Sequence, residues 1–160
     1  MKRYRILPFF DFDLRVHSLA ESINDTWPEV IKEQQRQNRA SVIEGLKYQF
    51  GVEDHEQKVQ NFIEIGPKPM SVVAFHNLFF SQVRSSFVFG SYYPALTGAC
   101  ALGERILNHL ILSLREDFRS TVEYKRVYRK DSFDDWDLAI NTLSSWSILL
   151  PEAEKDFRLL

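Results

Sequence analysis

The sequence of 160 residues contains a single cysteine, Cys100, and this scarcity excludes two kinds of stabilising framework. One thiol can neither close a disulfide within the chain nor supply the several thiolates of a cysteine-based metal cluster. Cys100 lies between Ala99 and Ala101, a setting typical of a small buried side chain. The folded state must therefore depend on an ordinary apolar core, for which a chain of this length suffices.

Long apolar runs and an excess of charge of one sign are also missing. No stretch of about 20 residues is apolar enough to span a bilayer, and residues 1–15 lack the apolar segment of a secretory signal. The formal net charge is −2, so the chain as a whole does not attract nucleic acids or anionic membranes, although this balance is compatible with a local basic patch. We therefore expect a cytoplasmic protein without a membrane partner.

The spacings that identify common catalytic sites are absent as well. The histidines are scattered outside any HExxH-type metal motif, and neither a glycine-rich phosphate loop nor a G-x-S-x-G elbow occurs. Asp131, Asp134, Asp135 and Asp137 are close in sequence, but they lie at the start of a predicted helix, whose dipole favours acidic residues there. We therefore expect no metal and no cofactor.

Aromatic side chains are abundant and make up 14% of the residues. Apolar residues recur at helical spacing between strong breakers, and strand-type alternation of useful length is missing. The pattern predicts an all-α protein, an antiparallel helical bundle with an irregular N-terminal arm at residues 1–28. We expect a single domain over residues 1–160, in which 1–65 hold the arm and the first helices and 70–160 hold the bundle.

Caps and breakers set the expected helix bounds. Gly51 ends the first helix, and Ser132 with Asp135 resembles a capping box before a later one. Gly66–Pro69 is the strongest breaker, and if the chain has an internal boundary, we expect it there. The last helix is still continuing at residue 160, which favours a truncated domain as much as a natural end. The predicted helices are residues 29–50, 54–65, 70–89, 94–116, 133–150 and 151–160, and residues 120–130 form a short basic and aromatic segment.

The helix of residues 94–116 combines close packing with embedded polar groups. A row of small residues recurs every four positions and predicts close approach by another helix. The polar groups are spaced as i, i+4 pairs, Glu104 with Asn108 and Arg105 with His109, so that they can satisfy one another structurally. The small residues of the row are Ala95, Ala99 and Gly103.

A functional interpretation of the same polar groups is also open. Glu104, Arg105 and His109 are the candidate catalytic residues, because Arg binds phosphate, His is a general acid or base, and Glu can orient both. That trio would suit ribonuclease-type cleavage of a phosphodiester. The structural interpretation is favoured, since charged groups in core helices are commonly ion pairs.

Residues 124–130 are the most credible binding patch, which we call the basic segment. Its basic side chains can contact phosphates while its tyrosine rings stack on bases, and Arg115 and Arg119 could extend it. The alternative is a solvated linker whose tyrosines pack on the body of the protein. The residues assigned to nucleic-acid binding are Tyr124, Lys125, Arg126, Arg129 and Lys130, interleaved with Tyr128.

From about residue 71 to residue 160 the sequence resembles the HEPN superfamily, the higher-eukaryote and prokaryote nucleotide-binding helical domains. The resemblance rests on the apolar helix of residues 70–89, on the small residues and acidic–basic pair of residues 94–116, and on the basic connector before the tryptophan-bearing helix of residues 133–150. It implies an antiparallel bundle that commonly dimerises, and often a metal-independent ribonuclease of toxin–antitoxin or phage-defence systems.

The catalytic signature of that family is an arginine followed, after four to six residues, by a histidine on a late helix. Here three residues separate Arg105 from His109 on an earlier helix, and two residues without a histidine follow Arg158. The resemblance therefore transfers no catalytic residue. We expect an RNA-related, homodimeric HEPN-like domain of a bacterial defence or toxin-type protein that lacks complete nuclease machinery. The alternatives are a non-enzymatic dimerisation or protein-interaction module and, third, a small-molecule enzyme.

Overall fold

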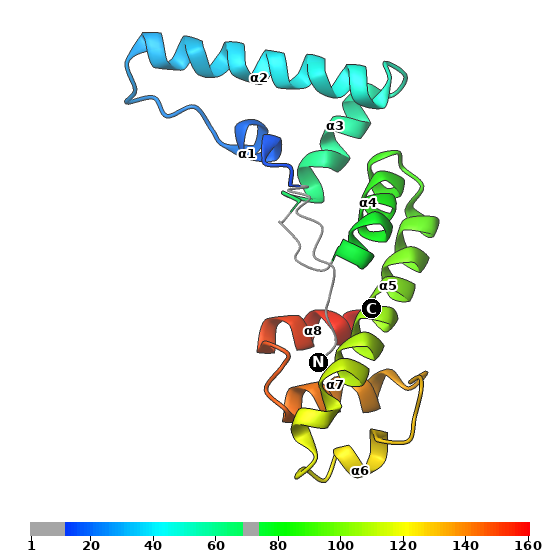
Figure 1. Ribbon diagram of the computed structural model, residues 1–160. Coiled ribbons are helices and arrows are strands. Elements are labelled where there is room, and N and C mark those ends of the chain that lie inside the picture. Colours follow the sequence, from blue (N-terminus) through cyan, green and yellow to red (C-terminus); the bar gives the residue numbers. More distant parts are fainter. Residues whose placement is uncertain (1–11, 69–73) are drawn as a thin grey trace. The chain divides into compact units, whose positions relative to one another are not determined.

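The computed structural model describes residues 12–68 and 74–160. Within these ranges the regular structure is helical, apart from one isolated backbone bridge between Asp13 and Lys68 (Figure 1). The predicted all-α class is confirmed. Residues 1–11 of the expected arm and residues 70–73 of the expected third helix lie outside the described residues.

Contacts within the chain divide it into two compact units, Met1–Ala95 and Leu96–Leu160. The division falls near the start of a helix and not at the Gly66–Pro69 breaker, the position at which the sequence would place any internal boundary. The reason is that helices on both sides of the breaker pack together in the first unit. The single-domain organisation over residues 1–160 stays a prediction, and we describe each unit by itself.

Among its described residues, the first unit contains four helices besides the first residues of a fifth, Tyr92–Ala95. They are α1 (Arg15–Ala20), α2 (Glu29–Phe50), α3 (His55–Glu64) and α4 (Ala74–Val88). The bounds predicted for α2 are confirmed, and Gly51 ends it with a φ of 81° that favours glycine. The prediction of an irregular arm through residue 28 was wrong where α1 forms, because Val16 and Leu19 bury one face of a helix too short to give a clear pattern.

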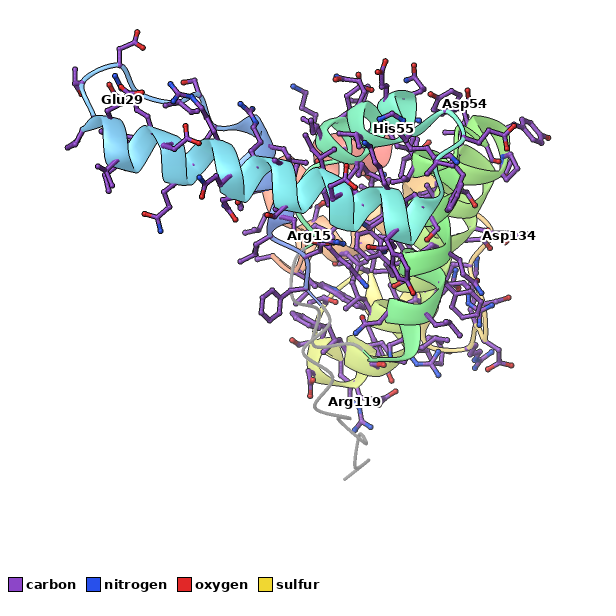
Figure 2. All side chains as sticks on the ribbon, turned by 90° about the horizontal axis from the view of Figure 1, so that it is seen from above. Arg15, Glu29, Asp54, His55, Arg119 and Asp134 are labelled. Carbon is purple, nitrogen blue, oxygen red and sulfur yellow. The ribbon has the colours of Figure 1, made fainter. Side chains whose placement is uncertain are left out.

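The core of the first unit forms where α1, α2 and α3 meet (Figure 1). Its buried side chains come from all three helices and from the end of α4, and the ring of Phe50 lies 6.0 Å from that of Phe62. The opposite end of α2, marked by Glu29 in Figure 2, carries solvent-exposed ion pairs instead. The buried apolar residues of this core are Val16, Leu19, Leu46, Phe62 and Val88.

The second unit is built around α5 (Tyr92–Leu114), most of which lies in this unit. A 3₁₀ turn, η1 (Arg115–Phe118), follows directly, and then come α6 (Tyr124–Val127), α7 (Trp136–Ser145) and α8 (Pro151–Leu159). One apolar core joins all of these helices, and Trp146 stacks on Phe118 with ring centroids 4.6 Å apart. Its fully buried members are Leu107, Ile111, Val127, Phe133, Ile140 and Leu143.

The start of α7 differs from the prediction. The helix begins at Trp136, and Asp135 caps it by accepting a 2.9 Å hydrogen bond from the backbone N–H of Leu138. Ser132 was therefore wrongly predicted as the cap. Phe133 precedes the helix, and both its backbone N–H and its carbonyl are bound by the side chain of Asn108.

Gly103 explains one position of the small-residue row on α5. A Cβ placed on Gly103 would lie 2.8 Å from Cη2 of Trp136 and 3.2 Å from Cε1 of Phe157. The two rings lie 5.8 Å apart, so aromatic side chains of α7 and α8 occupy the space that the missing side chain leaves. At Gly103 the close contact predicted for another helix is therefore made by the aromatic rings of Trp136 and Phe157.

Replacing Gly103 with valine should lower the free energy of unfolding of the second unit by about 1–3 kcal/mol, because the added atoms overpack against Trp136. Gly45 is the matched control, since a Cβ there has no neighbour within 4 Å and alanine favours the helix. Gly45→Ala should raise the free energy of unfolding by about 0.5–1 kcal/mol. Urea unfolding followed by circular dichroism measures both changes, and a stabilised Gly103→Val variant would contradict the packing described.

Candidate nucleic-acid interface

The polar residues of α5 separate into two kinds. Glu104, Arg105 and His109 are exposed on the surface of the helix, whereas Asn108 is partly buried. The side chain of Asn108 reaches the backbone carbonyl of Glu104 at 3.0 Å and not its carboxylate. Asn108 thus forms a hydrogen bond with the backbone of Glu104 in place of the predicted pairing of the two side chains. The catalytic assignment of Glu104, Arg105 and His109 stays a prediction.

Asn108 ties α5 to the segment before α7. Its Nδ2 donates to the carbonyl of Phe133 at 2.8 Å, and its Oδ1 accepts from the N–H of Phe133 at 2.6 Å. One amide side chain therefore satisfies both backbone groups of a residue whose ring is buried in the core. The sequence gives no signal of this role, because the two residues are far apart along the chain.

The basic segment begins with the single turn of α6. Its Val127 is fully buried in the core, and Tyr124 donates its backbone N–H to the hydroxyl of Thr121 at 3.3 Å. The same hydroxyl accepts the indole N–H of Trp146 at 3.1 Å. A helix of this length is not stable by itself, so these attachments to the core fix the turn.

Arg115 holds the other end of the basic segment. Its Nη1 donates to the carbonyls of Val127, at 3.2 Å, and Lys130, at 2.6 Å. Val127 is the last residue of α6, and its carbonyl also accepts the backbone N–H of Lys130 at 3.1 Å, so Arg115 binds a turn that continues from the helix end, where a cation is favoured. Arg115 therefore supports the backbone of the basic segment and does not extend its binding surface.

Arg119 does not add free positive charge to the patch. It points into solvent (Figure 2) and pairs with Glu116, whose Oε2 lies 2.7 Å from its Nε. That hydrogen bond raises the pKa of Arg119 above its ordinary value. Because Glu116 balances the charge, Arg119 contributes little attraction for an anionic partner.

The cations of the basic segment are exposed. Within the described ranges, none of the ion pairs involves Lys125, Arg126, Arg129 or Lys130. Between Glu123 and Asp131, the two flanking acids, these four cations leave a local charge of +4 − 2 = +2. The segment therefore carries a local positive charge although the chain as a whole is acidic.

The tyrosines of the segment are arranged with these cations. The rings of Tyr124 and Tyr128 stack with centroids 5.5 Å apart and planes inclined by 26°. The guanidinium carbon of Arg129 lies 5.0 Å from the centroid of Tyr128, within cation–π range. Tyr128 is 38% exposed. The structure thus brings together the residues assigned to this patch as a short strip of rings and cations.

Comparisons of the chain with protein-family models, with curated proteins and with solved structures find no match. The resemblance to HEPN domains therefore depends on the order and character of the helices alone. In the part of the chain that the structure describes, every helix is too short or too polar to cross a bilayer.

Truncating Asn108 should destabilise the second unit strongly, because both backbone groups of Phe133 would lose their partner. We expect Asn108→Ala to lower the free energy of unfolding by about 2–3 kcal/mol. Glu104→Ala, on the exposed side of the same helix, should change it by less than about 0.5 kcal/mol. Chemical denaturation measures the free energy of unfolding of both variants. Equal values for the two variants would contradict the structural role of Asn108.

Proposed function

We propose that this chain is an RNA-related helical domain that binds single-stranded RNA through the basic segment. One observation carries the proposal: four exposed cations without carboxylate partners in the described ranges adjoin a stacked tyrosine pair, Tyr124 and Tyr128. Phosphates attract lysine and arginine regardless of sequence, and exposed rings provide faces for unpaired bases. Both kinds of contact occur together on this one turn of chain.

The attachments beneath the segment explain how it can act as a preformed surface. The backbone is held by hydrogen bonds to Arg115 and Thr121 and by the buried side chain of Val127. The side chains of Lys125, Arg126 and Arg129 are exposed to solvent. Ordering the backbone before RNA binds reduces the entropy that binding must overcome. The proposal therefore requires no rearrangement of the second unit.

RNA cleavage is not part of the proposed activity. The acid–base candidates Glu104, Arg105 and His109 lie on the exposed surface of α5, and their spacing departs from the arginine–histidine signature of HEPN ribonucleases. We therefore propose a HEPN-like, cytoplasmic, homodimeric member of a defence or toxin-type system that binds RNA without cleaving it. The order of the helices along residues 74–160 supports this class.

A protein-interaction module is the second candidate function. Three large side chains of α2 are exposed, with exposed fractions of 78% for Val30, 41% for Ile31 and 96% for Tyr48. Isolated exposed apolar residues are normal in globular proteins, so this observation is weaker than the charge pattern of the basic segment. Binding of RNA that depends on the basic segment would favour the first candidate.

The charge contribution can be tested with a triple variant, Lys125→Gln, Arg126→Gln and Arg129→Gln. Fluorescence anisotropy with a labelled single-stranded oligouridine should show an affinity at least tenfold lower than that of the unaltered chain. The dependence of log affinity on log salt should become shallower by about 2, since each phosphate contact on single-stranded nucleic acid contributes roughly 0.7. The labelled RNA should remain intact throughout.

The matched control removes three positive charges from α2, by Lys32→Gln, Arg36→Gln and Lys47→Gln. These cations are paired with Glu29, Glu33 and Glu44. Their loss should leave RNA affinity within about twofold, because exposed pairs contribute little to an external field. Equal losses in both triple variants, or no binding by the unaltered chain, would contradict the assignment to the basic segment.

A further inference from the structure

A cavity of about 520 Å³ lies in the first unit, where the turn between α2 and α3 meets the turn between α4 and α5 (Figure 1). Its volume falls within the range of small-molecule sites, about 300–1,000 Å³. The lining residues belong to residues 54–61 and 88–92, away in sequence from the ends of the described ranges. The first group supplies polar side chains and the second supplies aromatic rings, so the cavity has two chemically different walls.

The side chain of Asn61 joins these two walls. It is 1% exposed, and its Nδ2 donates to the carbonyls of Phe87 at 3.1 Å and Val88 at 3.2 Å. Its Oδ1 accepts from Nε2 of Gln57 at 2.9 Å and from the hydroxyl of Tyr92 at 3.0 Å. These four bonds use the whole hydrogen-bonding capacity of the amide. Asn61 therefore fixes α3 to the α4–α5 turn and leaves the binding of a ligand to other groups.

Two aromatic residues of the cavity lining are half exposed although they are held in place. Tyr92 is 50% exposed, and its ring lies 5.4 Å from that of Phe87 in an edge-on arrangement. Phe89 is 49% exposed, and its ring lies 5.7 Å from that of Phe50. Large rings that are fixed and partly exposed beside a cavity offer contact area to an apolar or aromatic group.

The polar wall carries two opposite charges, Asp54 and Lys58, that are not paired with each other. Within residues 12–68 and 74–160, none of the ion pairs includes either residue. The Nζ of Lys58 donates to the carbonyl of Phe50 at 3.0 Å and lies 5.1 Å from the ring centroid of Phe89. An ammonium group has three N–H donors, so it can still donate to a ligand.

Asp54 lies at the turn between α2 and α3 (Figure 2). It precedes α3, but its side chain makes no capping hydrogen bond. Its carbonyl accepts the backbone N–H of Lys58 at 3.1 Å, so the two residues lie on one turn of chain. A ligand that binds both must therefore carry an ammonium and a carboxylate close together. A ligand with a single charge would leave the other group without a partner as water is displaced.

We propose that this cavity binds a free aromatic α-amino acid. Its ammonium group binds the carboxylate of Asp54, its carboxylate binds the ammonium of Lys58, and its ring packs against Phe89 and Tyr92. An α-amino acid has both charges on one carbon atom, which matches two opposite charges on one turn of chain. The site is separate from the basic segment, because all of its residues belong to the first unit. Its test is accordingly independent of RNA binding.

Isothermal titration calorimetry of the full chain with L-phenylalanine tests the proposal. We expect saturable one-to-one binding. Phenethylamine lacks the carboxylate, 3-phenylpropionate lacks the ammonium and L-alanine lacks the ring. Each should bind at least about fivefold more weakly, because each loses one of the three contacts. Absence of saturable binding of L-phenylalanine, or equal affinity for any of the other three compounds, would overturn the proposal.

Variants then locate the site. Asp54→Asn should weaken L-phenylalanine binding about tenfold, because it removes the charge, while asparagine tolerates the positive φ of 49° at this position. The matched control is Glu53→Gln, which removes the neighbouring acid outside the cavity lining and should leave the affinity within about twofold.

Lys58→Gln should also weaken binding about tenfold. Lys58 holds the carbonyl of Phe50 at the end of α2, so Asp54→Asn keeps the test valid if Lys58→Gln does not fold. Equal affinities of Asp54→Asn and Glu53→Gln would contradict the assignment to this cavity.

Discussion

The amide of Asn108 is the constraint on which the second unit depends. By binding both backbone groups of Phe133, it fixes the chain between α6 and α7 to the middle of α5. Arg115 fixes the preceding turn through the carbonyls of Val127 and Lys130. The first of these attachments lies just after the basic segment and the second lies within it, so the exposed cations are carried by a backbone that the second unit has already ordered.

Charge is distributed unevenly over this chain. Its formal net charge is −2, yet cations outnumber acids along the basic segment. Many of the acids are instead used locally: Glu116 pairs with Arg119, Glu29 and Glu33 pair with Arg36, and Asp135 caps α7. Because these acids are engaged elsewhere, the four cations of the basic segment have no carboxylate partner among the described residues, a feature that the overall balance does not reveal.

The sequence predicted those features that depend on neighbouring residues. The bounds of α2 follow from local breakers, and the basic segment could be found because its residues are contiguous. The start of α7 was misplaced at Phe133, whose two backbone groups are bound by a distant residue, Asn108, in a contact that neighbouring residues do not reveal.

The central claim, that single-stranded RNA binds on the basic segment, is tested most directly by heteronuclear NMR of the unaltered chain titrated with an unlabelled oligouridine. The account predicts saturable shifts of backbone amide signals concentrated in residues 124–130, with the signals of α2 unchanged. Shifts of similar size over all exposed basic residues, or shifts that avoid residues 124–130, would contradict it.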